Sequence, residues 1–334
     1  MSSPHDALFK YVFSQPEHAA SELRAVLPTE LSKRIDWSSL ELQPTSFVDE
    51  RLSGRHADLL FTIRCQGRKT YIYVLLEHQS TPDALMAFQL LRYLVRIWEA
   101  FLVEHPEGER LPAIIPVVVH HSQRGWTAAT DLCSLIDADA DTLALLVGYI
   151  PQFRFVLDDL SHADDSALRG RSLTAVAAAG LMLLARGRAP NLHDQLRRWI
   201  DVFCQVAAAR NGVEALSAFL EYTFRVGEVL PEDLRRLALE IGPVAAEAYM
   251  TAAQKLTEES YARGRAEGEA KGKAEGKAEG RAEGKAELLI RLLGLRFGPL
   301  PAAARGKILH ATPDLLDVWA ERIIAGRSLE EILG

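Results

Sequence analysis

Two short segments carry residue types suited to metal-dependent hydrolysis. Asp58 lies in the first, and Glu77 and Gln79 lie in the second, on either side of His78. Carboxylate oxygens are the ligands that Mg2+ prefers in proteins, and a bound divalent cation lowers the pKa of a water and offsets negative charge on a phosphate. The amide of Gln79 can orient a water but cannot take up its proton. These residues therefore predict hydrolysis of a phosphate ester with Mg2+, or Mn2+ in its place.

The spacing between the two segments predicts that a β-hairpin brings the carboxylates together. Both flanks of Gln66-Gly67-Arg68-Lys69 are rich in β-branched and aromatic residues. With Gly67-Arg68 as a two-residue turn, the antiparallel register places Asp58 directly opposite Glu77. The same register pairs apolar residues on the other face: Leu59 with Leu76, Phe61 with Val74 and Ile63 with Ile72. We therefore expect both carboxylates at the open end of the hairpin, with Gln79 following on their face.

Apolar periodicity predicts the elements that position this hairpin. Helical spacing is expected over residues 6–13, 17–27 and 83–104. Extended segments are expected over residues 40–48, 57–65, 70–76 and 112–120, with one more strand at the sheet edge over 153–157. This order of elements predicts a mixed α/β domain that covers residues 1–160.

Beyond residue 160 the sequence predicts only helices. Residues 161–260 are rich in Ala and Leu at helical spacing, and residues 261–287 repeat a unit close to Lys/Arg-Ala-Glu-Gly. A lone helix with a glycine at every fourth position is marginally stable. The repeat is therefore either a helix packed against another helix or subunit, or a solvated linker. Residues 288–334 regain an amphipathic pattern and are expected to form a helical cap.

The composition limits the class of protein. The formal net charge of -7 means that a polyanion partner would need a local basic patch. The three cysteines lack the spacing of a zinc site or a disulfide framework, which favours a reducing compartment. We find neither a leader nor an apolar run of about 18 residues that would cross a membrane. We therefore expect a soluble, cytoplasmic protein.

The motifs, taken in order, resemble those of the PD-(D/E)XK nuclease superfamily. Within it the chain is similar to the recombination-promoting nuclease (Rpn) group, also described as transposase-like. The resemblance covers about the first 160 residues, and the repeat with its helical tail is also similar to that group. It rests on four segments: His5-Asp6-Ala7-Leu8-Phe9-Lys10, Ala57-Asp58-Leu59-Leu60-Phe61, Leu76-Glu77-His78-Gln79-Ser80 and Leu90-Leu91-Arg92-Tyr93.

The resemblance implies a mixed sheet flanked by helices and the activity of a DNA endonuclease linked to recombination or transposition. It also implies that Asp58, Glu77 and the carbonyl of His78 would bind Mg2+, and that Gln79 replaces the lysine of the superfamily. Because an amide cannot act as a lysine does, slow turnover is expected. Ala57 stands where the superfamily name has proline, which donates no ligand.

Four further residues are expected near DNA. Lys10 lies on the N-terminal helix, His56 lies close to Asp58, and Arg92 and Arg96 are four residues apart on the helix after the hairpin. Helix positions four apart share a face, so the two arginines would act together on a phosphate backbone. The ordinary alternatives are a surface ion pair for Lys10, loop packing for His56 and arginines that flank a core helix.

Two adjacent histidines, His120 and His121, end the strand expected over residues 112–120. Their side chains must point to opposite faces of a sheet, so they cannot bind one metal ion together. A structural role is expected for both, although one of the two is placed to line the cleft.

The sequence leaves a second function open. An acidic overall charge and Gln79 in place of lysine also suit a catalytically degenerate nuclease fold that serves as a DNA- or protein-binding assembly module. For the nuclease, the helical C-terminal region is expected to serve either assembly, by joining copies of the chain into a homo-oligomer, or positioning of the nuclease domain.

Overall fold

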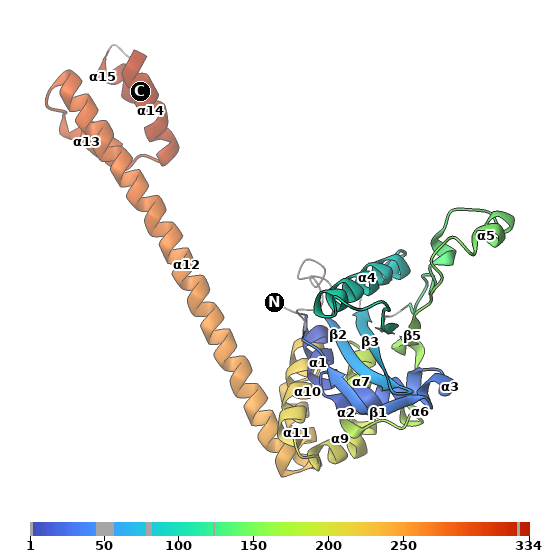
Figure 1. Cartoon of the computed structure of the whole chain (residues 1–334). Coiled ribbons are helices and arrows are strands. Elements are labelled where there is room, and N and C mark those ends of the chain that lie inside the picture. Colours follow the sequence, from blue (N-terminus) through green and yellow to red (C-terminus); the bar gives the residue numbers. More distant parts are fainter. Residues whose placement is uncertain (1–2, 45–56, 78–81, 123, 326–327) are drawn as a thin grey trace. The chain divides into compact units, whose positions relative to one another are not determined.

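The computed structural model describes residues 3–44, 57–77, 82–122, 124–325 and 328–334, with only the backbone for residues 57–58, 75–77 and 324–325. The chain forms two compact units, Met1–Gln254 and Lys255–Gly334 (Figure 1). Among the described residues, no helix is both long and apolar enough to cross a lipid bilayer.

The first unit is built on a five-stranded mixed sheet in which the strand order follows the chain. The antiparallel strands are β1 (Ile35–Leu42), β2 (Ala57–Cys65) and β3 (Arg68–Glu77), and β4 (Ala113–His120) and β5 (Val156–Asp159) continue parallel to β3. Parallel neighbours need a long crossover, and helix α4 (Met86–Glu104) supplies it between β3 and β4. The predicted fold class, a mixed α/β sheet flanked by helices, is confirmed.

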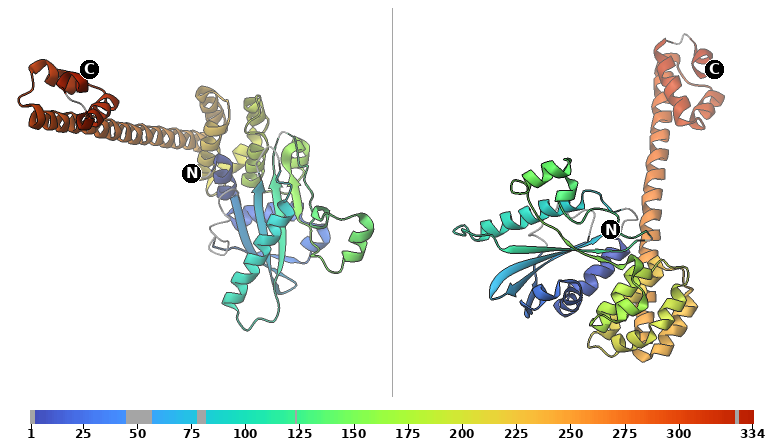
Figure 2. Two further views of the ribbon diagram at one scale, coloured as in Figure 1. Left: turned by 90° about the horizontal axis from the view of Figure 1, so that it is seen from above. Right: turned by 90° about the vertical axis from the view of Figure 1, so that its right-hand side faces the viewer.

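Helices cover both faces of this sheet. In the right-hand view of Figure 2, α4 (teal) lies on one side of the strands and the N-terminal helices (blue) lie on the other. Phe61 and Ile72 belong to the core under helices α1 (Pro4–Phe13) and α2 (Pro16–Val26). The core under α4 contains Leu60, Tyr71, Tyr73 and Val118. Side chains alternate along each strand, and this alternation separates the two cores.

The β2–β3 hairpin has a different turn from the predicted one. Gln66 and Gly67 form it, with φ of 48° and 77°, and Cys65 pairs with Arg68. A type I′ turn needs positive φ at both central residues, which glycine adopts readily, whereas the predicted turn required it of Arg68. Asp58 consequently pairs with Leu75. The predicted direct pairing of Asp58 with Glu77 was wrong.

The register shift preserves the sorting of residues between faces. Each β2 residue is displaced by two positions along β3, and a shift by an even number leaves every side chain on its expected face. The observed apolar pairs are Leu59 with Val74 and Phe61 with Ile72, while Ile63 pairs with Thr70. The hairpin therefore buries the predicted face with different partners.

Two strand boundaries also differ from the predictions. Strand β1 spans Ile35–Leu42 instead of residues 40–48, of which 45–48 lie outside the described residues. A β-bulge between Asp36 and Glu41 interrupts the alternation by which strands are found in a sequence. Strand β5 begins and ends later than residues 153–157, because Asp158 and Asp159 belong to it although neither is apolar.

The helices after the sheet share the sheet's hydrophobic core. Buried residues of α7 (Ala175–Arg186) and α10 (Gly212–Val226) belong to the same cluster as α1 and the sheet. The contact between α1 and α7 is close, since a Cβ atom on Gly180 would lie 2.9 Å from Cγ2 of Val12. The core is therefore continuous across residue 160, the boundary expected from the sequence.

A buried ion network also joins these parts. Arg171, just before α7, donates hydrogen bonds to Oε1 of Glu22 in α2 at 3.1 Å and to both carboxylate oxygens of Asp158 in β5 at 3.0 and 2.7 Å. Glu22 is 3% exposed. Burial, followed by the negative charge of Asp158, raises the pKa of Glu22 well above its ordinary value. Glu22 and Asp158 thus share one cation.

The repeat forms part of one continuous helix, α12 (Pro243–Phe297). Within the second unit, the end of α12 packs with α13 (Ala302–Leu309), α14 (Pro313–Ala325) and α15 (Leu329–Leu333) around a small core that includes Trp319. The glycines of the repeat face open space, because a Cβ atom would have no neighbour within 4 Å at positions 264, 268, 272, 276, 280 and 284. The repeat is a solvated helical stretch within this unit.

Gly180→Ala is predicted to lower the free energy of unfolding of the first unit by about 1–3 kcal/mol, because Val12 is buried and β-branched and cannot move aside cheaply. Urea unfolding measures the change. Gly276→Ala is the matched control: it makes the same substitution in a helix without a close neighbour, and up to about 1 kcal/mol of stabilisation is expected. Equal effects of the two substitutions would contradict the close contact.

Glu22→Gln is predicted to become more stable relative to the parent as the pH rises. The unfolded chain ionises Glu22 near the ordinary pKa of 4.5, whereas the folded chain resists ionisation because its pKa is raised. The parent therefore loses stability with rising pH between these two pKa values, and glutamine removes that loss. Urea unfolding at several values between about pH 5 and about pH 8 gives the difference.

Glu30→Gln, at an exposed carboxylate, controls for the loss of one charge. A stability difference between Glu22→Gln and the parent that stays constant over the whole pH range would show that Glu22 is ionised in the folded protein.

Candidate functional site

The backbone places Asp58 and Glu77 on the same face of the sheet. Asp58 is the second residue of β2, and Glu77 is the last residue of β3. Because Asp58 pairs with Leu75, Glu77 is its diagonal neighbour, roughly 7–8 Å away across the ladder. Asp58 lies two residues before Leu60 on β2, and Glu77 lies four residues after Tyr73 on β3. Residues an even number apart on a strand share a face, so both carboxylates belong to the face covered by α4. His56, His78 and Gln79 lie outside the described residues.

Two further polar residues lie level with Glu77 on the next two strands of the sheet. Glu77 pairs with His120 of β4, and His120 pairs with Asp159 of β5. Paired residues of parallel neighbours lie on one face, so Glu77, His120 and Asp159 form a row at the carboxyl ends of three strands. Neither His120 nor Asp159 was among the site residues predicted from the sequence. Each is a polar residue that ends an apolar strand, but the strand order was needed to align them.

His120 is held in place by its neighbours. The side chain is 0% exposed, and its Nε2 lies 3.0 Å from Oγ of Ser122. The indole of Trp126 meets the imidazole edge to face, with 5.1 Å between ring centroids. A buried ring with a fixed hydrogen bond has one orientation, so His120 is a rigid part of the packing at this end of the sheet.

The segment after β4 is hydrogen-bonded to the end of β5. Asp159 accepts the backbone N–H of Trp126 at 2.8 Å and that of Ser161 at 3.1 Å. Gly125 has a φ of 79°, and a Cβ there would lie 2.7 Å from Nε2 of His162, so the close approach requires glycine. These contacts position Trp126, and through it His120.

Asp159 is an anion at neutral pH. Burial alone would raise its pKa, but hydrogen bonds from Ser161 and Trp126 and the nearby charge of His120 together lower the pKa below its ordinary value. Asp159, at the end of β5, therefore adds a fixed negative charge to the row.

His121 turns to the opposite side of the sheet from His120. Its ring lies 4.8 Å from the ring of His5 in α1, and Nδ1 of His5 lies 2.8 Å from the hydroxyl of Tyr222 in α10. His121 thus contributes to the packing between the sheet and the helices. The predicted separation of the two histidines is confirmed, and the two have different surroundings.

Three of the residues expected near DNA, Lys10, Arg92 and Arg96, belong to helices on the two sides of the sheet. Lys10 is half-buried on α1, which covers the other face of the sheet. Asp6, four residues before it, accepts the N–H of Ser3 in a capping box. Arg92 and Arg96 lie on the solvent side of α4, where Arg96 pairs with Glu99 at 2.9 Å. DNA would meet these arginines only by passing over the outer surface of α4.

The donor set at this end of the sheet suits a hard divalent cation. Two carboxylates on neighbouring strands, completed by a main-chain carbonyl, waters and phosphate oxygens, form a normal Mg2+ environment. Among the side chains that the structure describes, no group of three or more His, Cys, Asp or Glu residues can hold a metal ion. The side chains of Asp58 and Glu77 are outside that set.

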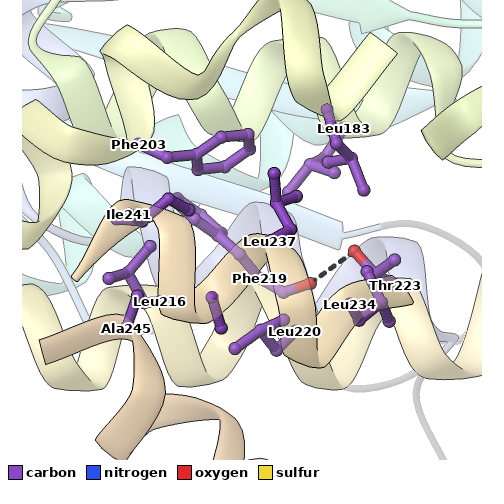
Figure 3. A pocket seen from close by; sticks show the side chains of 12 residues that line it. Leu183, Phe203, Leu216, Phe219, Leu220, Thr223, Leu234, Leu237, Ile241 and Ala245 are labelled. Atoms are coloured by element: carbon purple, nitrogen blue, oxygen red, sulfur yellow. Dashed lines mark hydrogen bonds between the residues drawn. The ribbon is translucent and has the colours of Figure 1, made fainter. Parts of the chain in front are cut away.

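A cavity in the helical part of the first unit offers no alternative site (Figure 3). Its volume is about 30 Å³, and its lining is almost entirely apolar. The hydroxyl of Thr223 is already engaged, because it donates to the carbonyl of Phe219 at 2.8 Å. A small apolar void without available polar groups stays dry. It is a gap in packing between helices.

The fold and the position of its acidic residues define the class of protein. A hairpin that carries Asp58 and Glu77 on one face, followed by a helical crossover and a parallel strand, is a PD-(D/E)XK nuclease-like arrangement. The chain belongs to the family described as putative transposase, YhgA-like, whose model matches residues 3–213.

The chain is also similar to individual members of the Rpn group. It is 40% identical to recombination-promoting nuclease RpnD of Escherichia coli O157:H7 over 123 residues, which are 37% of this chain and 47% of that protein. Identity to recombination-promoting nuclease RpnA of Escherichia coli K12 is 26% over 261 residues, or 77% of this chain and 85% of RpnA. The match to RpnD thus spans about half of that relative.

Not every similar protein is named as an active enzyme. The putative inactive recombination-promoting nuclease-like protein YjiP of Escherichia coli K12 is 43% identical over 96 residues, which cover 29% of this chain and 93% of YjiP. No solved structure matches the chain.

Proposed function

We propose that this protein is a divalent-cation-dependent DNA endonuclease that acts in recombination or transposition. The observation that carries the proposal is the placement of Asp58 and Glu77 on one face, at adjoining ends of β2 and β3. Relatives named as recombination-promoting nucleases support it.

In this proposal Asp58, Glu77 and the carbonyl of His78 hold Mg2+, or Mn2+ in its place. A bound cation would lower the pKa of a water molecule and offset negative charge on the phosphate. Gln79 orients the attacking water by hydrogen bonds. The water oxygen bonds to phosphorus and loses a proton to solvent, while the bond from phosphorus to the leaving sugar oxygen breaks and that oxygen takes up a proton.

His120 extends the site beside Glu77. It is the cross-strand partner of Glu77, and Ser122 and Trp126 fix its ring. Because its side chain is fully buried, His120 acts from behind the site: an imidazole in one orientation can hydrogen-bond an oxygen of a neighbouring carboxylate. In this role His120 positions groups within the site.

DNA is the proposed substrate. Because the formal net charge of the chain is -7, DNA would bind to a local basic surface. Lys10 and His56 remain proposed contacts with the phosphate backbone. A cytoplasmic location is part of the same proposal, and it is supported by three cysteines that are free: Cys65, Cys133 and Cys204.

Asp58→Asn and Glu77→Gln are each predicted to reduce nicking of supercoiled plasmid by about 100-fold or more with Mg2+ or Mn2+, because each removes a charged ligand. Agarose gels measure the rate as a function of metal concentration. Asp36→Asn, on the edge strand β1, is the matched control and should cleave like the parent. Full cleavage by both Asp58→Asn and Glu77→Gln would refute the assignment of the site.

A second candidate function is a degenerate nuclease fold that binds DNA or protein without cutting. The observation that favours it is the similarity to YjiP, which is named as inactive. Isothermal titration with Mn2+ separates the two functions: binding that disappears in Asp58→Asn supports the nuclease, and no binding by the parent supports the module.

We also propose that the C-terminal helical region joins copies of the chain. Six glycines in a solvated helix cost up to about 1 kcal/mol each, so a partner helix along this surface would stabilise it. Truncation before Arg265 is predicted to reduce the mass measured by sedimentation by half or more. An unchanged number of subunits per particle would show that the repeat serves as a spacer.

A further inference from the structure

The turn end of the β2–β3 hairpin carries a local excess of positive charge. Residues 33–36 and 64–69 contain five cationic side chains and one carboxylate, that of Asp36. We call the five cationic residues the hairpin patch, and all of them are exposed: Lys33, Arg34, Arg64, Arg68 and Lys69. The patch lies at the opposite end of β2 and β3 from Asp58 and Glu77.

Strand pairing brings the cationic residues of the patch together. Arg64 of β2 is directly opposite Lys69 of β3. The carbonyl of Arg34, just before β1, accepts the backbone N–H of Gln66 at 3.0 Å, which places Arg34 beside the turn. Like charges directly opposite each other on an antiparallel ladder are destabilising, because the two Cβ atoms are only about 4.5–5.5 Å apart. The hairpin thus contains an unfavourable pairing that a bound anion would relieve.

Most of these charges are not neutralised within the protein. Lys33 pairs with Glu30 at 2.7 Å. Among the residues that the structure describes, no carboxylate lies within ion-pair distance of the other four cationic side chains. Asp36 is the cross-strand partner of Arg64, but its carboxylate accepts hydrogen bonds from the N–H and the hydroxyl of Ser38 at 3.1 and 2.5 Å. Four of the five positive charges are therefore available to an anionic partner.

Other carboxylates border the patch. Glu104 ends α4, and Glu107 and Glu109 follow in the connection that enters β4. Three strand spacings separate β4 from β1, or roughly 14 Å at about 4.8 Å each. On β1 the next carboxylate after Asp36 is that of Glu41, beyond the β-bulge. The positive excess is thus concentrated around the turn, on the side of β1 and β2.

We propose that the hairpin patch is a second contact with the phosphate backbone of duplex DNA, separate from the site of hydrolysis. The identity of this polyanion rests on the proposed nuclease function. Arg64 lies six residues after Asp58 on β2, or roughly 20 Å away at about 3.3 Å per residue. This length corresponds to about six base pairs of B-form DNA at about 3.4 Å each. A duplex bound at the site can therefore contact the patch within one helical turn.

The chemistry of the patch suits phosphate groups. Arginine binds phosphate oxygens through a planar fork of donors, and lysine binds them as a point charge. Contacts with the phosphate backbone carry no direct information about the base sequence. The patch is therefore expected to raise the affinity for DNA of any sequence, and its contribution should fall as the salt concentration rises.

Binding of duplex DNA to the full chain tests the proposal. Fluorescence anisotropy with a labelled duplex of about 30 base pairs, or three turns, gives the affinity at several salt concentrations without divalent cations. Arg64→Glu and Lys69→Glu should each weaken binding by about threefold or more at low salt. Each should also lower the slope of log affinity against log salt by about one, because one phosphate contact is lost.

Two controls separate charge at the patch from other effects. Arg235→Glu, at an exposed position of helix α11 (Pro231–Ile241), makes the same charge change elsewhere and should bind DNA like the parent. Arg64→Lys keeps the charge and should retain most of the affinity, whereas Arg64→Gln should lose it. Equal weakening by Arg64→Glu and Arg235→Glu, or Arg64→Lys that binds as weakly as Arg64→Gln, would overturn the proposal.

The proposal and the nuclease assignment fail in different ways. If the parent nicks plasmid and Asp58→Asn does not, while Arg64→Glu and Lys69→Glu bind DNA like the parent, the nuclease stands and the second contact is refuted. If these two variants weaken binding but the parent does not cleave with Mg2+ or Mn2+, the second contact stands and the nuclease assignment is refuted. A parent that binds no duplex at low salt would also overturn the second contact.

Discussion

The first unit depends on one buried helix packed on two sides. Helix α1 packs against the sheet on one side and against α7 and α10 on the other, and Gly180 allows the backbone of α7 to approach Val12 closely. Both partners bury apolar surface on the same ten-residue helix. One face of the sheet thereby packs against α1, and the residues proposed to form the site belong to the face that α4 covers.

The acidic residues on the two sides of the sheet have different surroundings. On the packed side, Arg171 neutralises the charge of Asp158 and also donates to Glu22, whose pKa is raised by burial and by the charge of Asp158. On the α4 side, Asp58, Glu77 and Asp159 lie on different strands at the same end of the sheet, where a bound cation would offset negative charge. Adjacent residues Asp158 and Asp159 serve these two environments because alternation along β5 points them apart.

This separation explains how related proteins can share a fold without sharing an activity. The core around α1 contains none of the residues expected to bind the metal, so this core does not depend on them. A relative named as inactive is therefore compatible with a retained sheet. The glycine repeat in α12 is likewise separate from this core and exposed to solvent.

The sequence by itself determined the order of helices and strands, the alternation that puts Asp58 and Glu77 on one face, and the motifs shared with the Rpn group. These features depend on local periodicity, which can be read from residues that are close together in the sequence. Only the tertiary structure decided the register, because the sign of φ at Gln66 and Gly67 selects the turn. Only the tertiary structure aligned His120 and Asp159 with Glu77, because this alignment depends on the order of the strands in the sheet. It also showed that the later helices share the sheet core, because that packing depends on close contacts such as the one between Gly180 and Val12, which no local sequence pattern encodes.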